Sequence, residues 1–188
     1  MYARAGKRVF DLILALLSTL ILIPLLVLVS VLIWVSDPGP LLFVQQRVGR
    51  HGKTFTFYKF RSMPTETSDM PSDQLGKIRL TWIGRLIRRT NIDELPQLLN
   101  IVLGDMSLVG PRPAIPQQDE LLELRKKNTA LSIRPGLTGL AQVNSYDGMS
   151  VEEKARFDGE YARAVTLWHD FSIILRTIGY LFKKPPVY

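Results

Sequence analysis

The segment from Leu12 to Val35 contains no charged residue and constrains this chain more than any other feature. It is too long and too apolar for a helix of a small soluble domain, and it exceeds the roughly 20 residues that a helix needs to cross a bilayer. A cleaved signal peptide is an alternative, but its apolar region is usually shorter and ends at small residues. Here residues 36–40 read Ser-Asp-Pro-Gly-Pro, which favours a retained membrane helix.

Pro24, near the middle of this segment, removes a backbone hydrogen bond and kinks a helix. Each half is then about 18 Å long, less than the roughly 30 Å of the hydrocarbon core. Basic residues flank both ends, whereas a simple span concentrates them on one side; they are Arg4, Lys7, Arg8, Arg47, Arg50, Lys53 and Lys59. The pattern favours a re-entrant helix with both ends in the cytoplasm. A span kinked at Pro24 is the alternative, since prolines occur in transmembrane helices.

Composition limits the chemistry that is open to the chain. It has 188 residues, a net charge of +7, no cysteine and 2 histidines. The positive charge indicates anionic partners, which are nucleic acid, phospholipid headgroups or phosphorylated metabolites. The missing thiols exclude disulfides and cysteine nucleophiles, and the usual Cys/His zinc spacings are absent. Any catalysis must therefore use carboxylates, hydroxyls, basic side chains or a metal held by oxygen ligands.

Residues 1–37 are expected to form the membrane domain, and residues 38–188 a mainly helical cytoplasmic domain with a few short strands. Hydrophobic periodicity and Gly/Pro punctuation predict its elements. Strands are expected at 41–44, at 54–60 and within 133–144, helices at 80–87, 95–102, 118–130 and from 151 onward, and loops at 64–78 and 104–116. The apolar run 171–182 could lie on a membrane surface or pack into the core.

Asp93 and Glu94 lie where a helix is expected to begin, with Asn91 as its N-cap. The helix dipole favours acidic residues at this position, so a purely structural role is the first interpretation. Catalysis is the alternative, because a carboxylate is among the few nucleophiles that this composition allows. The surroundings favour it, since guanidinium groups bind phosphate oxygens; the arginines concerned are Arg85, Arg88, Arg89 and Arg112.

Three further basic residues are candidates for binding phosphate. Arg112 lies between two prolines, and this stiffened backbone suits a side chain that grips a diphosphate. A solvated loop arginine is the alternative. Lys59 and Arg61 lie at the end of the second predicted strand, where they could bind substrate phosphate or lipid headgroups.

Ordered motifs cover nearly the whole chain. They are KRxFD at 7–11, PGP at 38–40, QRxGxxG at 46–52, FYKFRSM at 57–63, DELPQ at 93–97, GDMSLVGPRP at 104–113 and RPGLTGLAQVN at 134–144. In this order they closely resemble the bacterial sugar-transferase family, the small monotopic phosphoglycosyl transferases that begin lipid-linked glycan assembly. The ordered blocks are far more specific than any single motif.

The resemblance implies a re-entrant membrane helix, a site on the cytoplasmic face of the bacterial inner membrane, and Mg²⁺ as cofactor. It also implies a two-step reaction. Asp93 would attack the β-phosphate of a UDP-sugar and release UMP, and polyprenol (undecaprenyl) phosphate would then take the phosphosugar from Asp93. Glu94 would help to hold the metal or manage the proton of the acceptor phosphate. The product is the first membrane-bound intermediate of a glycoprotein, capsule, O-antigen or exopolysaccharide.

Carried over residue by residue, the resemblance assigns Asp93 as nucleophile and metal ligand, and Glu94 as the second catalytic residue. The substrate-binding set is expected to be Lys59, Arg61, Arg88, Arg112, Arg134 and Gln142, while Arg8 and Pro24 belong to the membrane helix. The implied partners are a UDP-sugar, polyprenol phosphate and the phospholipid membrane, and not nucleic acid. Helices parallel to the interface would also be compatible with a homodimer.

The chain departs from the family pattern at two places. Ile23 precedes Pro24 where relatives often have Ser, which removes a hydroxyl from the helix break. Residues 145–148 read Ser-Tyr-Asp-Gly where many relatives continue Gly-Arg, which leaves the donor sugar open. No other apolar segment precedes Leu12, as in the minimal form of the family. A membrane-anchored basic binding module and an inactive assembly scaffold are the competing functions, and the intact Asp93-Glu94 pair favours the enzyme.

Overall fold

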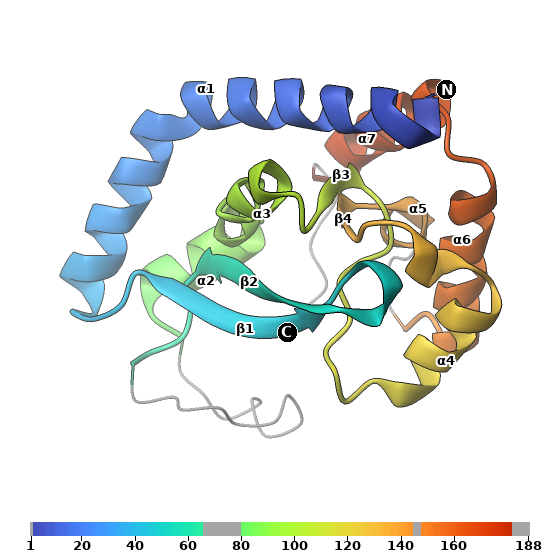
Figure 1. The fold of residues 1–188 in the computed structure, drawn as a ribbon. Coiled ribbons are helices and arrows are strands. Elements are labelled where there is room, and N and C mark those ends of the chain that lie inside the picture. Colours follow the sequence, from blue (N-terminus) through green and yellow to red (C-terminus); the bar gives the residue numbers. More distant parts are fainter. Residues whose placement is uncertain (1, 66–79, 145–147, 182–188) are drawn as a thin grey trace.

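The computed structural model describes residues 2–65, 80–144 and 148–181 (Figure 1). Its helices are a π-helical turn Tyr2–Gly6, α1 Lys7–Ser36, α2 Trp82–Arg89, α3 Gln97–Leu103, α4 Asp119–Lys127, α5 Leu140–Asn144, α6 Val151–Arg163 and α7 Leu167–Leu181. Its strands are β1 Leu42–Val48, β2 Thr54–Phe60, β3 Ser107–Val109 and β4 Gly136–Thr138. Three 3₁₀ turns, Arg50–Gly52, Ile92–Glu94 and Ala130–Ser132, complete the described elements. The predicted class, mainly helical with a few short strands, is confirmed.

Two sequence predictions fall on segments outside these ranges. Most of the loop expected at 64–78 lies outside the described residues, because the description stops at Thr65 and resumes at Leu80. The same holds for residues 145–147, which make up most of the tetrapeptide that departs from the family pattern.

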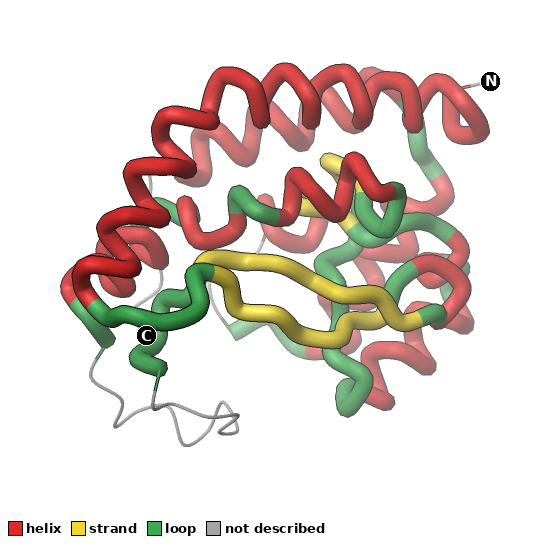
Figure 2. Tube along the Cα trace, turned by 60° about the vertical axis from the view of Figure 1, so that its left-hand side comes forward, coloured by secondary structure: helices red, strands yellow, loops and turns green. Residues whose placement is uncertain are grey.

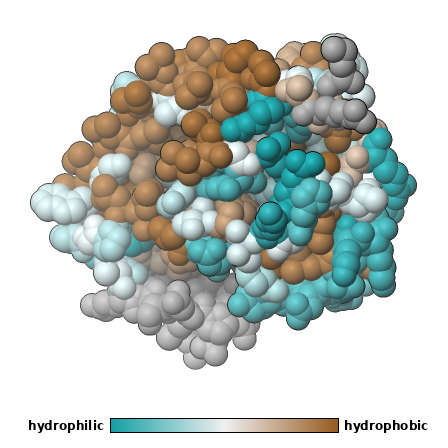
Figure 3. Space-filling model, viewed as in Figure 1, coloured by the Kyte–Doolittle hydropathy of each residue, from teal (hydrophilic) through white to brown (hydrophobic). Residues whose placement is uncertain are grey.

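Helix α1 is 30 residues long and contains Pro24. Figure 1 shows that it bends partway along its length, as expected for a helix with an internal proline. Only 11% of its most apolar 18-residue window is buried, whereas the core helix of a soluble protein is mostly covered by its neighbours. Figure 3 shows the resulting continuous hydrophobic area over α1. A long, exposed apolar helix is thus present, as the sequence predicts.

One narrow face of α1 packs against the rest of the protein, which Figure 2 shows beneath the helix. Its first half contributes to a cluster with β2 and α3, formed by the buried residues Ala15, Phe57, Leu98, Ile101 and Met106. Its second half contributes to a cluster with β2 and α2, formed by Val29, Ile33, Phe60, Ile83 and Ile87. Because α2 and α3 flank the 3₁₀ turn that carries Asp93, this packing fixes α1 relative to the candidate site.

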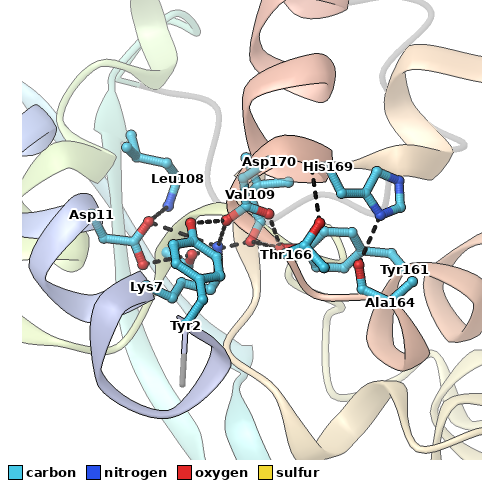
Figure 4. Close-up of polar contacts among 11 residues, drawn as sticks. Tyr2, Lys7, Asp11, Leu108, Val109, Tyr161, Ala164, Thr166, His169 and Asp170 are labelled. Atoms are coloured by element: carbon cyan, nitrogen blue, oxygen red, sulfur yellow. Dashed lines mark hydrogen bonds and ion pairs between the residues drawn. The ribbon is translucent and has the colours of Figure 1, made fainter.

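The first turns of α1 are also tied to the C-terminal helices by buried polar groups (Figure 4). Asp170 on α7 is fully buried and accepts hydrogen bonds of 2.6 Å from the Tyr2 hydroxyl, the Lys7 ammonium and the Tyr161 hydroxyl. Three donors around one carboxylate compensate for its loss of water. The contact joins residues more than 160 positions apart in the chain.

Asp11 forms a second buried link from α1 (Figure 4). Its carboxylate accepts hydrogen bonds from the Ser107 hydroxyl at 2.8 Å and from the Leu108 backbone N–H at 3.1 Å. These contacts connect α1 directly to β3. The KRxFD motif therefore docks the start of α1 onto the rest of the protein.

The strands form two small sheets. β1 and β2 make an antiparallel hairpin with the register Leu42↔Phe60 to Val48↔Thr54. β1 runs four residues beyond the strand expected at 41–44, since pairing with β2 extends it through the basic residues. β3 and β4 pair in parallel, with Ser107 opposite Gly136 and Val109 opposite Thr138. β3 lies in a stretch that was expected to be a loop, because a three-residue strand has too little periodicity to be detected.

Two local predictions are wrong. Asn91 does not cap a helix: it has a left-handed backbone (φ 54°) and no side-chain capping bond. Asp93 and Glu94 occupy a separate 3₁₀ turn, and α3 begins only at Gln97, after Pro96. Residues 140–144 form helix α5 rather than strand or loop.

The predicted C-terminal helices are confirmed as α6 and α7. Helix α7 buries Ile173 in a cluster with Val109, Leu140 and Tyr161. Its other face exposes large apolar side chains, which are Leu167, Trp168, Phe171, Leu175 and Ile178. Core packing, one of the two alternatives for this run, is confirmed for the face that carries Ile173. Contact of the exposed face with a membrane surface stays a prediction.

Candidate active site

The candidate site is built around Asp93, on the 3₁₀ turn between α2 and α3. Its residue is only 6% exposed, and its Oδ2 lies 3.9 Å from the Lys59 ammonium at the end of β2. Burial and the neighbouring charge of Glu94 raise the pKa of Asp93 to about 6, although Lys59, Arg88 and Arg112 oppose the rise. Within the described part of the chain, the Asp93 side chain makes no hydrogen bond and no closer ion pair. Its carboxylate is therefore buried and anionic near neutral pH, with the long Lys59 contact as its charged partner.

Glu94 differs from its neighbour because Arg112 holds it at two points. Arg112 Nη2 donates to Glu94 Oε1 at 2.5 Å, and Nη1 donates to Oε2 at 3.4 Å. Burial alone would raise the pKa of Glu94, but the Arg112 guanidinium and Lys59 outweigh it and the pKa lies below its ordinary value. The two adjacent carboxylates thus differ in their contacts: Arg112 binds Glu94 at two points, whereas Asp93 has only the long contact to Lys59.

Arg112 is itself held by a buried ion pair. Its backbone carbonyl accepts a hydrogen bond of 2.9 Å from Arg125 Nη1 on α4. Arg125 donates through Nε and Nη2 to Asp158 Oδ2 on α6, at 2.8 and 2.6 Å, and both side chains are almost fully buried. A guanidinium fixed on one side by a carboxylate is a rigid donor on the other. The segment that presents Arg112 is therefore locked onto α4 and α6.

Lys59 is positioned by the hairpin. In the β1–β2 register it lies opposite Phe43, and its ammonium is 5.5 Å from the Phe43 ring centroid. Burial lowers the pKa of Lys59, and the carboxylates of Asp93 and Glu94 only partly offset this. The aromatic face and Asp93 together keep the charged group directed into the site.

Arg88 and Arg61 are two further cations near Lys59. Arg88 Nε donates to the Ser62 hydroxyl at 2.8 Å, and its charge lies close enough to Asp93 to act against the raised pKa of that carboxyl. Arg61 donates to the Asp37 carbonyl, and the Asp37 Oδ2 lies 3.5 Å away. Arg61 therefore binds the segment that follows α1.

A half-open pocket of about 280 Å³ lies beside these groups. It is lined by Pro40, Leu42, Phe43, Val44, Lys59, Arg61, Ser62, Met63, Pro64, Thr65 and Arg88. Three cationic residues thus line one cavity, with the Arg61 guanidinium bound to Asp37 at its edge, and the remaining wall is mostly apolar. Such a cavity suits an anionic ligand that also carries a flat or apolar part.

The other two predicted substrate-binding residues lie elsewhere. Arg134 precedes β4, and its Nε donates to the Gly104 carbonyl at 2.8 Å, at the C-terminal end of α3. Gln142 lies on α5, where its Nε2 donates to the Leu137 carbonyl at 3.4 Å. Neither side chain contacts Asp93 or Glu94 within the described residues. The predicted set thus divides into a group around Asp93 and two outlying residues.

Arg47 is a site neighbour that was not among the predicted site residues. Its guanidinium lies 5.2 Å from the Phe57 ring centroid, and its Nη1 donates to the Pro113 carbonyl at 3.3 Å. Burial and the nearby charge of Arg112 lower the pKa of Arg47 to about 10. The QRxGxxG motif contained this residue, but only the fold brings it beside Arg112.

Gln97 is the second such neighbour. It is 1% exposed, and its carboxamide lies close enough to Glu94 to help to lower the pKa of that carboxyl. Its Nε2 nevertheless makes no hydrogen bond of normal geometry to any described residue. A buried amide without a partner is costly, so a ligand oxygen near Glu94 would satisfy it. The last position of the DELPQ motif was the signal in the sequence.

The donor set around Asp93 is compatible with Mg²⁺. The described residues contain no group of three or more acidic or histidine side chains that could enclose a metal. Mg²⁺ in phosphoryl-transfer sites does not need one, because one or two carboxylates, water and substrate phosphate complete its shell. The Asp93 carboxylate, which makes no hydrogen bond to the described residues, could serve as the protein ligand of such an ion. The fit requires a phosphate-bearing ligand as the remaining donor.

The chain is similar in sequence to a known protein family and to several of its members. The chain matches the bacterial sugar transferase family over residues 2–184. It is 40% identical over 191 residues to a UDP-glucose:undecaprenyl-phosphate glucose-1-phosphate transferase of Caulobacter vibrioides, covering 97% of this chain and 72% of that protein. It is 36% identical to an undecaprenyl-phosphate galactose phosphotransferase of Salmonella typhimurium, covering 99% of this chain and 42% of that protein.

A third relative is an undecaprenyl-phosphate glucose phosphotransferase of Komagataeibacter xylinus, 44% identical over 92% of this chain and 35% of that protein. The chain thus spans less than half the length of the Salmonella and Komagataeibacter relatives. The family match nevertheless covers almost every residue, including the whole Asp93 site. The chain therefore belongs to the bacterial sugar transferase family.

Proposed function

We propose that this chain transfers a sugar 1-phosphate from a UDP-sugar to undecaprenyl phosphate and releases UMP. The names of its relatives support this reaction, with either glucose or galactose as the sugar. The observation that carries the proposal is the asymmetric carboxylate pair, in which Arg112 contacts Glu94 at two points while the buried Asp93 has only a long contact of 3.9 Å to Lys59. A binding module or a scaffold would not require this difference.

The donor would bind with its diphosphate among the cations around Asp93. Arg88 and Lys59 face the pocket beside Asp93, and Arg112 lies across the turn next to Glu94. Guanidinium and ammonium groups neutralise phosphate charge, which lets an anionic carboxylate approach phosphorus. When bound, Mg²⁺ would supply further charge neutralisation, with Asp93 as its protein ligand.

In the first step an Asp93 carboxylate oxygen attacks the β-phosphorus of the donor. A bond forms between that oxygen and phosphorus, and the bond from phosphorus to the bridging oxygen breaks. UMP leaves with the bridging oxygen, and the phosphosugar stays on Asp93 as an acyl phosphate. Burial supports this role, because a poorly solvated carboxylate needs less desolvation before it attacks.

In the second step a phosphate oxygen of the acceptor attacks the same phosphorus. The bond to Asp93 breaks, the carboxylate is restored, and the product is an undecaprenyl diphosphosugar. Glu94 remains anionic under the influence of Arg112, so it orients Arg112 and can accept a proton from a monoprotonated acceptor phosphate. The protein groups that take part in each step are thus the residues of the Asp93 turn and its cationic neighbours.

We further propose that α1 is a re-entrant membrane helix and that the site faces the cytoplasm. Both ends of α1 are attached to the same domain: Lys7 binds Asp170, and Asp37 just after the helix binds Arg61. A simple span would place these ends about 30 Å apart across the hydrocarbon core. The bend at mid-helix (Figure 1) supports the same arrangement.

The test is UMP release by the purified full chain in detergent, with Mg²⁺, undecaprenyl phosphate and a panel of UDP-sugars. The expected result is release from one or a few donors, with loss of at least about 1,000-fold in Asp93→Asn. Glu160→Gln, which neutralises an exposed carboxylate on α6, is the matched control and should retain full release. Folded wild-type protein that releases UMP from no donor would refute the proposal.

A further inference from the structure

A second cluster of cations lies at the C-terminal end of α3, and it is assembled from distant parts of the chain. Arg8 on α1 donates to the carbonyls of Ile101 and Val102, at 2.5 and 3.0 Å. Arg134 Nε donates to the Gly104 carbonyl at 2.8 Å. A methyl group added at Gly104 would lie 3.4 Å from Arg8 Nη2. Two guanidinium groups therefore meet at the same helix end.

Arg50 adds a third positive charge from the turn between β1 and β2. Its Nε donates to the Ser132 carbonyl at 2.8 Å, two residues before Arg134. Arg134 experiences the charges of both Arg8 and Arg50, and together with burial they lower its pKa. We refer to Arg8, Arg50 and Arg134 as the arginine cluster.

Helix capping accounts for only part of this cluster. Basic side chains near a helix C-terminus stabilise its last carbonyls and its dipole, which explains Arg8 and the Nε contact of Arg134. Arg50 and Arg134 each use Nε alone in the described structure. Their terminal Nη groups have no protein partner among the described residues. These are the donors that engage phosphate oxygens in two-point contacts.

The positive charge of the cluster is not balanced locally. The carboxylates that act on Arg134 are Asp11 and Asp105. Asp11 is already bonded to Ser107 and to the Leu108 backbone, and it is buried. Among the described residues this leaves Asp105 as the one carboxylate acting on Arg134 that makes no side-chain hydrogen bond, against three guanidinium groups. An anion between them would reduce their mutual repulsion.

The surroundings indicate where such an anion would come from. Val9 on α1 is 56% exposed, and Leu103 at the end of α3 is 60% exposed. Figure 3 shows a hydrophilic area directly beside the hydrophobic surface over α1 and α3. Basic groups at the edge of an apolar, membrane-facing surface lie at headgroup depth, where they bind anionic lipids.

We propose that Arg8, Arg50 and Arg134 form a binding site for the phosphate of an anionic lipid headgroup, separate from the site at Asp93. The terminal Nη groups of Arg50 and Arg134 hold the phosphate oxygens, and Arg8 fixes the site to the start of the membrane helix. The lipid tails follow the apolar surface beside Val9 and Leu103. This site retains the enzyme in anionic membrane and does not depend on the donor reaction.

The experiment measures the thermal unfolding midpoint (Tm) of the full chain in neutral detergent micelles. Three probes are added separately: phosphatidylglycerol, phosphatidylcholine and inorganic phosphate. The compared variants are Arg50→Gln, which removes one exposed guanidinium and leaves the Arg134 cap in place, and Arg50→Gln/Arg134→Gln. Lys126→Gln/Lys127→Gln is the charge-matched control, because both lysines are exposed on α4, away from α1 (Figure 1).

Phosphatidylglycerol is expected to raise the Tm of the wild type and of the lysine control by about 5 °C at saturation. Arg50→Gln should lose at least half of this rise, and the double variant nearly all of it, each judged against its own lipid-free Tm. An equal rise in Tm with inorganic phosphate would identify free phosphate as the ligand of the same site. A rise with phosphatidylglycerol but none with inorganic phosphate would identify the lipid. An equal rise with phosphatidylcholine, or a rise that the double variant retains, would overturn the proposal.

Discussion

Arg112 and Glu94 form a two-point ion pair in which Nη2 lies 2.5 Å from Oε1. The pair joins the turn that carries Asp93 to the proline-flanked segment between β3 and α4. It lowers the pKa of Glu94, while that of Asp93 is raised. Because Arg112 binds Glu94 and not Asp93, the two adjacent carboxylates differ: Glu94 orients the arginine, and Asp93 is the reactive group.

Replacing Arg112 by Lys should reduce kcat/KM for the UDP-sugar by about 100-fold. A lysine ammonium keeps the positive charge, but it cannot make the two-point contact with Glu94 and at the same time donate to a phosphate, as a guanidinium can. Steady-state UMP release measures the effect. Arg89→Lys, at an exposed position on α2, is the control and should change it less than twofold. Near wild-type activity of Arg112→Lys would mean that the two-point contact has no role in the reaction.

Replacing Asp93 by Asn should stabilise the folded protein, and more so at high pH. The folded-state pKa of Asp93 is raised to about 6, so the wild type loses stability as the pH rises from about 4 to about 6 and the buried group ionises. The stability difference between Asp93→Asn and wild type should therefore be about 2.5 kcal/mol larger at pH 8 than at pH 4.

Chemical unfolding in detergent with EDTA measures this difference without a metal on the carboxylate. Glu160→Gln serves as the control, because it neutralises an exposed carboxylate on α6. A constant difference for Asp93→Asn between pH 4 and pH 8 would show that Asp93 is not held in an unfavourable buried state.

Breaking the Arg125–Asp158 pair should destabilise the protein and displace Arg112. Asp158→Ala leaves a buried guanidinium without its partner, which costs about 3–5 kcal/mol. Thermal unfolding should show a lower Tm than for Glu160→Ala on the same helix. At a temperature where Asp158→Ala is still folded, its KM for the UDP-sugar should also rise. A variant that unfolds earlier but keeps its KM would limit the pair to a structural role.

Gly84 on α2 should not tolerate alanine. A methyl group there would lie 2.0 Å from the Ser62 carbonyl oxygen, so α2 or the Ser62 segment would have to move, at about 1–3 kcal/mol. Gly179→Ala on α7 meets nothing within 4 Å and should be neutral or slightly stabilising. Thermal unfolding compares the two variants. Equal Tm values would show that α2 and the pocket rim adjust freely.

The re-entrant arrangement can be tested with single cysteines, because the natural chain has none. Ala5→Cys precedes α1 and Lys53→Cys follows it, and both positions are exposed. A membrane-impermeant thiol reagent should label neither variant in intact cells and both after permeabilisation. Labelling of Ala5→Cys alone in intact cells would establish a simple span instead.

The sequence by itself determined the features that depend on neighbouring residues. The apolar segment around Pro24, the helical periodicities and the ordered motifs were all readable, because each is a local pattern of side-chain types. The same motifs led to the family, and they singled out Asp93, Glu94 and Arg112. Asn91 was misread because a left-handed backbone (φ 54°) is not visible in composition.

Only the tertiary structure decided which of these groups act together. It paired Arg112 with Glu94 rather than Asp93, committed Arg61 to Asp37, and placed Arg134 with Arg8. Contacts of this kind join residues that are far apart in the chain, so their geometry follows from how helices and strands pack. The direction of a pKa shift also depends on burial, which local sequence does not encode. The chemistry of Asp93 is therefore a property of its packed surroundings.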